Sequence, residues 1–256
     1  LTGPFILRRM KSEVLKELPP KTENLHRIEL DEQQRKLYLA AVVDAREKLR
    51  AAKPEDKMAV FAVLMRLRQI CCDPRLVADN WSGSSAKLDA CMELVTAAVE
   101  GGHRILLFSQ FTSMLELLAK RLDEAGVSHF TLQGSTPKPV RAELVRRFNS
   151  GEADVFLISL RAGGTGLNLT AADIVIHYDP WWNLAAQNQA TDRAYRIGQK
   201  NPVQVYKLIA QDTIEEKIVE LQQAKQSLAD TVTGGADGAI LSMNPEQLLQ
   251  LLGEEA

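Results

Sequence analysis

The sequence predicts a three-layer α/β fold, in which a parallel sheet lies between two layers of helices. Short apolar runs alternate along the chain with longer segments whose apolar residues have helical spacing. Two of these runs, Ile105–Phe108 and Ile174–Ile176, are continuously apolar, as expected for strands that helices cover on both faces. At 256 residues, with 45% hydrophobic and 25% charged residues, the chain has ordinary globular composition and can bury a sizeable core.

Residues 1–85 are expected to form a linker and a helical protrusion. Between Asp31 and Cys72, helix-forming residues dominate and apolar residues recur at intervals of three and four. The pattern is interrupted at Lys53-Pro54, so it predicts two helices joined as a hairpin. A turn and a polar loop over residues 73–85 then separate this part from the next.

Residues 86–211 carry the alternating pattern and are expected to hold the sheet. The predicted strands are Ile105–Phe108, Phe130–Leu132, Val155–Ile158, Ile174–Tyr178 and Val203–Ile209. The predicted helices lie near Thr112–Ala125, Pro137–Asn149 and Leu184–Arg196. Because strands alternate with helices, the strands are expected to run parallel.

Residues 212–256 are expected to form a C-terminal helix and a loosely attached tail. The charged helix is predicted from Thr213 to about Val232, where the glycine-rich stretch Thr233–Gly238 breaks it. A last short helix is predicted around Pro245–Leu252.

The composition limits the class of protein. The formal net charge of −2 gives no overall basic field, so any contact with nucleic acid has to come from a local patch. Three cysteines without zinc spacing, Cys71, Cys72 and Cys91, are expected to be reduced core thiols. No apolar run approaches the ~20 residues that span a bilayer, and the start at Leu1 without a signal-peptide pattern is typical of a fragment of an intracellular protein.

The stretch from Gln189 to Gln199 is the most informative part of the chain. On a helix with ~100° per residue, Gln189, Arg193 and Arg196 would point the same way. Guanidinium groups keep their charge and present planar donors that match phosphate oxygens, so this arrangement predicts a clamp for a polyphosphate. The alternative interpretation is an exposed amphipathic helix whose arginines pair with Asp192 or water.

Ligands of open α/β sheets bind beyond the carboxyl ends of the strands, and the loops there have unusual compositions. The loop from Ser159 to Asn168 interleaves glycines with Ser, Arg, Thr and Asn, which can meet phosphate or ribose oxygens. A plain tight turn would explain the glycines but not the polar residues between them. We therefore expect a binding loop after the strand that ends at Ile158.

Three further loops follow predicted strands. Ser109-Gln110 precedes a helix N-terminus, which suits a phosphate, although helix capping alone would explain such residues. Gly134–Thr136 is followed by Arg141, which belongs either to a solvated face or to a patch that contacts a nucleic-acid backbone. Asp179–Asn183 places two tryptophans side by side; one is expected to pack inward, and the asparagine to cap the next helix.

The ordered set of motifs resembles the Swi/Snf-type ATPases, which are superfamily-two, helicase-like DNA translocases. The set consists of Phe5–Lys11, Leu18–Lys21, Arg68–Cys71, Phe108–Gln110, Gly134–Thr136, Gly163–Asn168, Trp182-Asn183 and Asp192–Gln199. The resemblance extends from Phe5 to about Gln226. The turn at Ile70–Pro74 departs from the family's usual Asn-His-Pro or similar ending, which leaves the role of that turn open.

The resemblance implies a fold and a set of functional residues. Residues 86–211 would be a RecA-like second motor lobe with an inserted helical protrusion, followed by a brace helix at Thr213–Ser227. Arg193 and Arg196 match the arginine-finger positions, which stabilise charge on the γ-phosphoryl group of ATP. The other implied residues are Gly164, Gly166, Asn168 and Gln189 for nucleotide binding, Ser109, Gln110, Arg141, Ser159 and Thr165 for DNA binding, and Trp182 and Asn183 for coupling, with no metal ligand.

Half of the ATPase machinery is absent from this sequence. It has no Gly-x-x-x-x-Gly-Lys-Ser/Thr loop and no Asp-Glu pair at the end of a buried strand to hold magnesium. The resemblance implies that ATP and Mg²⁺ are bound mainly by a first RecA-like lobe of the same protein. It also implies that Arg8, Arg9 and Lys11 lie near the interface between the two lobes. The complete protein is therefore expected to be a DNA-dependent ATPase, and this chain alone is expected to be inactive.

The resemblance also implies partners and a compartment. Double-stranded DNA, held mainly at its phosphates, and the first lobe are the expected partners, with a DNA-bound protein complex as a target and no membrane. Tyr178–Asn183 is more similar to prokaryotic members, which indicates a nucleoid-associated enzyme of the cytoplasm; a eukaryotic member would be nuclear. Two alternatives stay open: a non-catalytic nucleic-acid-binding or interaction module with a RecA-like fold, and a strand-separating superfamily-two helicase.

Overall fold

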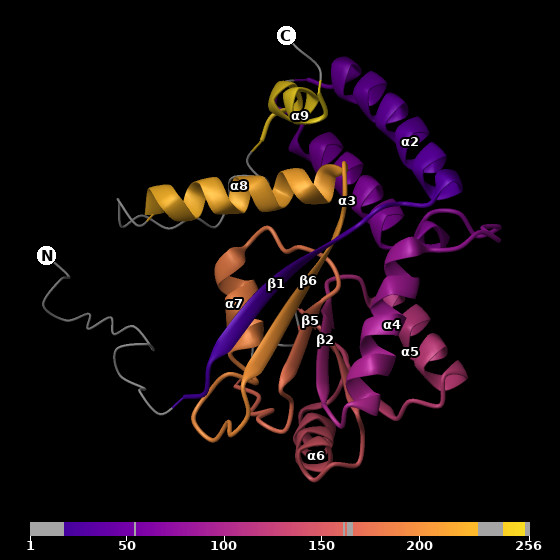
Figure 1. Ribbon diagram of the computed structural model, residues 1–256. Helices are drawn as coiled ribbons and strands as arrows, with labels where there is room; N and C mark the ends of the chain where they lie inside the picture. Colours follow the sequence, from indigo (N-terminus) through magenta and orange to yellow (C-terminus); the bar gives the residue numbers. More distant parts are fainter. Residues whose placement is uncertain (1–17, 54, 161, 163–165, 230–242, 254–256) are drawn as a thin grey trace, which may run out of the picture.

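The computed structural model describes residues 18–53, 55–160, 162, 166–229 and 243–253. Its centre is a sheet of parallel strands in the order β1-β6-β5-β2-β4-β3, with helices on both faces (Figure 1). The strands are β1 (Lys21–Ile28), β2 (Ile105–Ser109), β3 (His129–Leu132), β4 (Val155–Ser159), β5 (Ile174–His177) and β6 (Val203–Ala210). The helices are α2 (Glu32–Ala51), α3 (Lys57–Cys72), the 3-10 helix η2 (Pro74–Leu76), α4 (Ala86–Glu100), α5 (Thr112–Glu124), α6 (Lys138–Asn149), α7 (Leu184–Thr191), α8 (Ile214–Ala229) and α9 (Pro245–Leu251). This arrangement confirms the predicted three-layer α/β fold.

The core follows from the alternation of side chains along the strands. In β2, Ile105 and Leu107 point to one face of the sheet and pack with residues of α4 and α5. Leu106 and Phe108 point to the other face and pack with residues of α6 and α7, among them Phe148. The sheet is therefore buried on both faces, which explains its continuously apolar strands.

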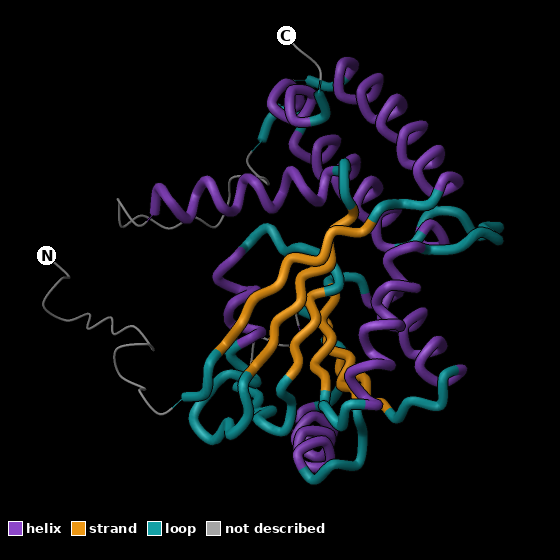
Figure 2. The backbone as a smooth tube through the Cα atoms, in the orientation of Figure 1, coloured by secondary structure: helices purple, strands orange, loops and turns teal. Residues whose placement is uncertain are grey.

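A second group of helices lies beyond the carboxyl ends of β1 and β6 (Figure 2). The carboxylate of Asp31 caps α2 by accepting a hydrogen bond from the N–H of Gln34 (2.8 Å). Asp56 caps α3 in the same way with the N–H of Ala59 (3.0 Å). The two helices form the predicted hairpin, here called the helical protrusion, and share an apolar cluster with α8 and α9.

Two segments differ from the prediction. Lys21–Ile28 is expected to lie in a linker, but these residues form β1, an edge strand paired along its length with β6. Most side chains of β1 are exposed, so the strand has no apolar alternation by which a sequence pattern could reveal it. The prediction of a loosely attached tail is wrong for α9, because Leu248 is fully buried among residues of α2 and α3. The predicted break at Thr233–Gly238 lies outside the described residues.

Candidate functional site

The carboxyl ends of the strands bring the predicted binding loops together. β2 pairs with β4 so that Ser109 lies beside Ser159, and with β5 so that Phe108 lies beside His177. β3 lies on the other side of β4 and adds the loop that contains Gly134. The loops after these strands therefore start next to one another at one edge of the sheet, where ligands of such folds bind.

Asp179, in the loop after β5, connects the ends of β5 and β2. Its buried carboxylate accepts hydrogen bonds from the hydroxyl group of Ser109 (2.6 Å) and from the backbone N–H of Gln110 (3.2 Å). Ser109 is fully buried, so its hydroxyl group faces Asp179 and not the surface. Ser159 is also buried, and its hydroxyl group accepts a hydrogen bond from the N–H of Ala162 (3.3 Å). Both serine side chains make hydrogen bonds that hold the backbone of these loops.

Arg68 of the helical protrusion supplies the positive charge opposite Asp179. Its guanidinium group is fully buried, and Nη2 donates to Asp179 Oδ2 (3.2 Å) and to the carbonyl oxygen of Pro180 (2.5 Å). The guanidinium carbon lies 4.0 Å from the centre of the Trp182 ring and 5.5 Å from that of Phe111. Burial raises the pKa of the Asp179 carboxyl group, and the charge of Arg68 opposes that shift.

The segment that carries Arg193 and Arg196 differs from the prediction. Helix α7 ends at Thr191, and the residues that follow form turns. The N–H groups of Arg193 and Ala194 bond to carbonyls three residues back (both 3.1 Å), and the carbonyl of Arg193 accepts the N–H of Leu169 (3.0 Å). The prediction of a helix near Leu184–Arg196 is therefore wrong beyond Thr191, and turns carry the two arginines.

The two arginines have different surroundings. Arg193 is 7% exposed, and its Nε is buried without a hydrogen-bond partner. Burial, followed by the charge of Arg196, lowers the pKa of Arg193, and the charge of Asp192 opposes that shift. Arg196 is half-buried, and its Nη1 donates to the carbonyl oxygen of Leu167 (3.3 Å). The burial of Arg193 does not fit the alternative of an exposed amphipathic helix.

The remaining predicted residues lie around the same edge of the sheet. Arg141 of α6 donates to three carbonyl groups of residues 133–136, at 2.7–3.2 Å, so its donors support the loop after β3. Gly166, Asn168 and Gln189 are exposed. Outside the described residues lie Gly164, Thr165, Arg8, Arg9 and Lys11.

The two tryptophans after β5 are both half-buried. Trp182 packs against the apolar cluster of α2, α3 and α8. Trp181 is held by its backbone: its N–H donates to Gln187 Oε1 (3.2 Å), and its carbonyl oxygen accepts a hydrogen bond from Gln222 of α8. Asn183 caps α7, as predicted, by accepting a hydrogen bond from an N–H of the first turn (2.9 Å).

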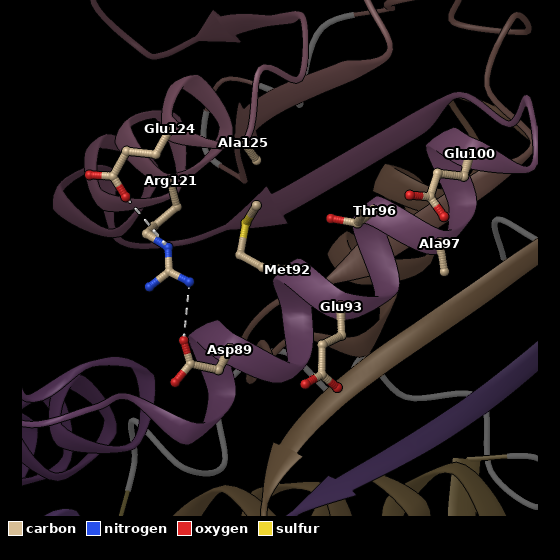
Figure 3. Close-up of a pocket in the computed structure, with 9 residues that line it drawn as sticks. All are labelled: Asp89, Met92, Glu93, Thr96, Ala97, Glu100, Arg121, Glu124 and Ala125. Atoms are coloured by element: carbon tan, nitrogen blue, oxygen red, sulfur yellow. Dashed lines mark hydrogen bonds and ion pairs between the residues drawn. The ribbon is translucent and has the colours of Figure 1, made fainter.

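A groove of about 750 Å³ between α4 and α5 lies apart from these loops (Figure 3). Its lining includes Arg121, which lies 3.2 Å from a carboxylate oxygen of Asp89 and 3.8 Å from one of Glu124. No predicted site residue lines this groove. Among the described residues no group of His, Cys, Asp and Glu could hold a metal ion, and no described helix is long and apolar enough to cross a membrane.

Comparison with known families decides the class of this chain. The family description "Helicase conserved C-terminal domain" matches residues 86–198, and "SNF2-related domain" matches residues 1–76. The solved C-terminal domain of the Sulfolobus solfataricus SWI2/SNF2 ATPase is 28% identical, with a TM-score of 0.75 over 92% of this chain and 100% of that domain. The chain belongs to the Swi/Snf family. It corresponds to the C-terminal lobe of the family's ATPases, which confirms the resemblance.

This chain, here called the Swi/Snf lobe, is similar to one part of longer relatives. The putative ATP-dependent helicase/translocase YwqA of Bacillus subtilis is 40% identical over 98% of this chain and 28% of its own length. The Sulfolobus solfataricus SWI2/SNF2 ATPase core in complex with dsDNA is 32% identical, with a TM-score of 0.78 over 99% of this chain and 55% of that one. The Swi/Snf lobe spans about a quarter of the length of the curated relatives that it matches.

Motifs in the sequence located the loops of the Swi/Snf lobe but missed the residues that position them. Arg68 lies in one of the motifs and Asp179 in the loop with the two tryptophans, yet no pattern indicated that they pair across 111 positions of sequence. One signal for Arg68 was available, because it lies in the apolar stripe of α3 next to Leu64 and Leu67. A charge in such a stripe needs a buried partner.

Proposed function

We propose that the Swi/Snf lobe is the second motor lobe of an ATP-driven, double-stranded-DNA translocase, to which it supplies two arginine fingers and part of a groove for the DNA backbone. Arg193 supports this proposal most directly, because the residue is 7% exposed, its Nε is buried without a hydrogen-bond partner, and the neighbouring Arg196 adds a second positive charge. Such a cation is unfavourable unless an anion approaches it. The γ-phosphoryl group of ATP, bound mainly by a first lobe together with Mg²⁺, would be that anion.

The arginines act on the charge that develops as the phosphoryl group is transferred. Their planar donors match phosphate oxygens, so Arg193 and Arg196 would stabilise the transition state. The turn that carries them is attached to the loop after β4 by the hydrogen bond between Leu169 and Arg193. The buried side chain of Gln199 joins the same two segments by donating to the carbonyl oxygens of Ala172 (2.7 Å) and Ala194 (3.2 Å). The arginines and the glycine-rich loop would therefore close on the nucleotide as one unit.

The DNA contacts in this proposal come from the loops that follow the carboxyl ends of the strands. Gln110 and Thr165 would bind phosphate oxygens, and Ser109 and Ser159 would contribute through the backbone that they hold. Contacts of this kind carry little sequence specificity. The names of the relatives support DNA translocation: one is called a helicase/translocase, and another was solved in complex with dsDNA.

The test uses the complete protein that contains this lobe. Arg193→Ala and Arg196→Ala should each lower the DNA-stimulated kcat by about 10³-fold or more, with thermal unfolding unchanged. The matched control is Arg121→Ala, which removes an arginine paired with Asp89 in the groove outside the site and should leave turnover unchanged. Unchanged turnover in both finger variants would reject the proposed roles.

The same assays separate the alternatives. Tight, salt-sensitive DNA binding by this lobe, combined with no DNA-stimulated turnover of the complete protein, would favour a non-catalytic binding module. Stimulation by single strands in place of duplex DNA would favour a strand-separating helicase. The proposal also predicts that this lobe without its first lobe does not hydrolyse ATP.

A further inference from the structure

The loop from Asp179 to Asn183 is held by four elements of the structure. Arg68 reaches it from α3, and Ser109 reaches it from the end of β2. Gln187 of α7 and Gln222 of α8 hold the backbone of Trp181 on either side. The loop is therefore the place where the helical protrusion, the sheet and α8 meet.

Arg68 makes the most varied contacts in this arrangement. It binds the Asp179 carboxylate and the Pro180 carbonyl with Nη2, while its guanidinium carbon lies over the Trp182 ring, 4.0 Å from the ring centre. Its Nε and Nη1 are buried without a hydrogen-bond partner. Two unsatisfied donors on a fully buried cation do not favour stability, and an apolar pair of similar volume often does as well or better. Stability alone is therefore a poor explanation of this arginine.

We propose that Arg68 is a positioning residue, which places Trp182 and Gln110 together and so makes the helical protrusion part of the DNA-stimulated step. The inference rests on the proposed function of the lobe. Stacking on the guanidinium plane sets the place of the Trp182 ring. The ion pair sets the place of Asp179, whose other oxygen accepts the N–H of Gln110 at the start of the neighbouring loop. A movement of α3 then shifts both loops together.

The same contacts explain why a lysine is not equivalent at this position. A lysine ammonium group could keep the charge opposite Asp179, but it is a compact charge without a plane that stacks on Trp182. Arg68→Lys therefore separates the stacking contact from the ion pair.

The experiment compares buried-pair variants in the complete protein. The double variant Arg68→Met/Asp179→Asn removes both charges at once, so no lone charge is left buried. The matched control is Lys87→Met/Glu215→Gln, which removes an equally buried ion pair between α4 and α8 that does not contact Trp182. For each protein, ATP turnover is measured without DNA and with saturating duplex DNA, together with the KM for ATP and the thermal unfolding temperature.

We expect the stimulation of ATP turnover by DNA to be about tenfold smaller in Arg68→Met/Asp179→Asn than in the parent. The KM for ATP and the turnover without DNA should stay close to those of the parent. Arg68→Lys should lose part of the stimulation, and the control pair should keep it. Full stimulation in both Arg68 variants, or an equal fall in turnover with and without DNA, would overturn the proposal. A parent protein without any DNA-stimulated turnover would instead contradict the proposed function.

Discussion

The ammonium group of Lys87 and the carboxylate of Glu215 form an ion pair in which both side chains are fully buried. The pair joins the first turn of α4 to the first turn of α8. Glu215 also accepts the backbone N–H of Ala210 (2.9 Å), and the Lys87 ammonium lies 5.6 Å from the centre of the Tyr178 ring. The pair therefore fixes the start of α8 against the carboxyl end of the sheet.

Removing one member of this pair should be strongly destabilising. Lys87→Met leaves the Glu215 carboxylate buried alone, so we expect the free energy of unfolding to fall by about 3–5 kcal/mol. In Lys87→Met/Glu215→Gln the lone charge is gone, and stability should return most of the way to that of the parent. Denaturant unfolding of the three proteins measures both effects, and a double variant as unstable as the single one would show that the lone charge is not the cause.

His177 should make stability depend on pH. It is fully buried, and burial lowers its pKa from 6.5 to about 3. Between these values the unfolded chain binds a proton that the folded chain does not, so the free energy of unfolding should decrease as the pH falls through this window. His177→Asn should reduce that slope, whereas His26→Asn, at an exposed position of β1, should not. If the free energy of unfolding depended on pH with the same slope in both variants and the parent, His177 would not be the cause of that dependence.

Helix α9 should contribute to the stability of the helical protrusion. Leu248 is fully buried in the cluster with α2 and α3, so Leu248→Ala is expected to lower the free energy of unfolding by about 2–5 kcal/mol. Gln250→Ala changes an exposed residue of the same helix and serves as the control. A loosely attached tail would instead show no difference between the two variants in thermal or denaturant unfolding.

The three cysteines should be inert in the folded protein. Cys71, Cys72 and Cys91 are buried free thiols, and burial raises the pKa of each, that of Cys91 to about 12. The thiolate is the reactive form, so a thiol reagent at pH 8 should label the folded chain only as fast as the chain unfolds. Denatured protein should react at once at all three positions. Rapid labelling under native conditions would show that at least one thiol is accessible.

Local sequence patterns located most of the sheet and the loops at its carboxyl edge. Strands such as β2 and β5 are buried on both faces, and this burial leaves a continuously apolar run that can be read without a structure. The glycine-rich loop, the Asn183 cap and the paired arginines were also visible, because residue type alone limits what each of them does. The motifs in their order were enough to indicate the Swi/Snf family.

The tertiary structure decided which of these residues are exposed and which are buried and hold others in place. β1 became a strand through its pairing with β6, and α7 ended at Thr191, after which a turn is attached to the loop after β4 by the bond between Leu169 and Arg193. Ser109 turned inward to Asp179, whose charge is balanced by a residue of the helical protrusion. Periodicity and propensity report on neighbours in sequence, whereas buried charges and hydrogen bonds are satisfied by partners that only the folded chain brings together.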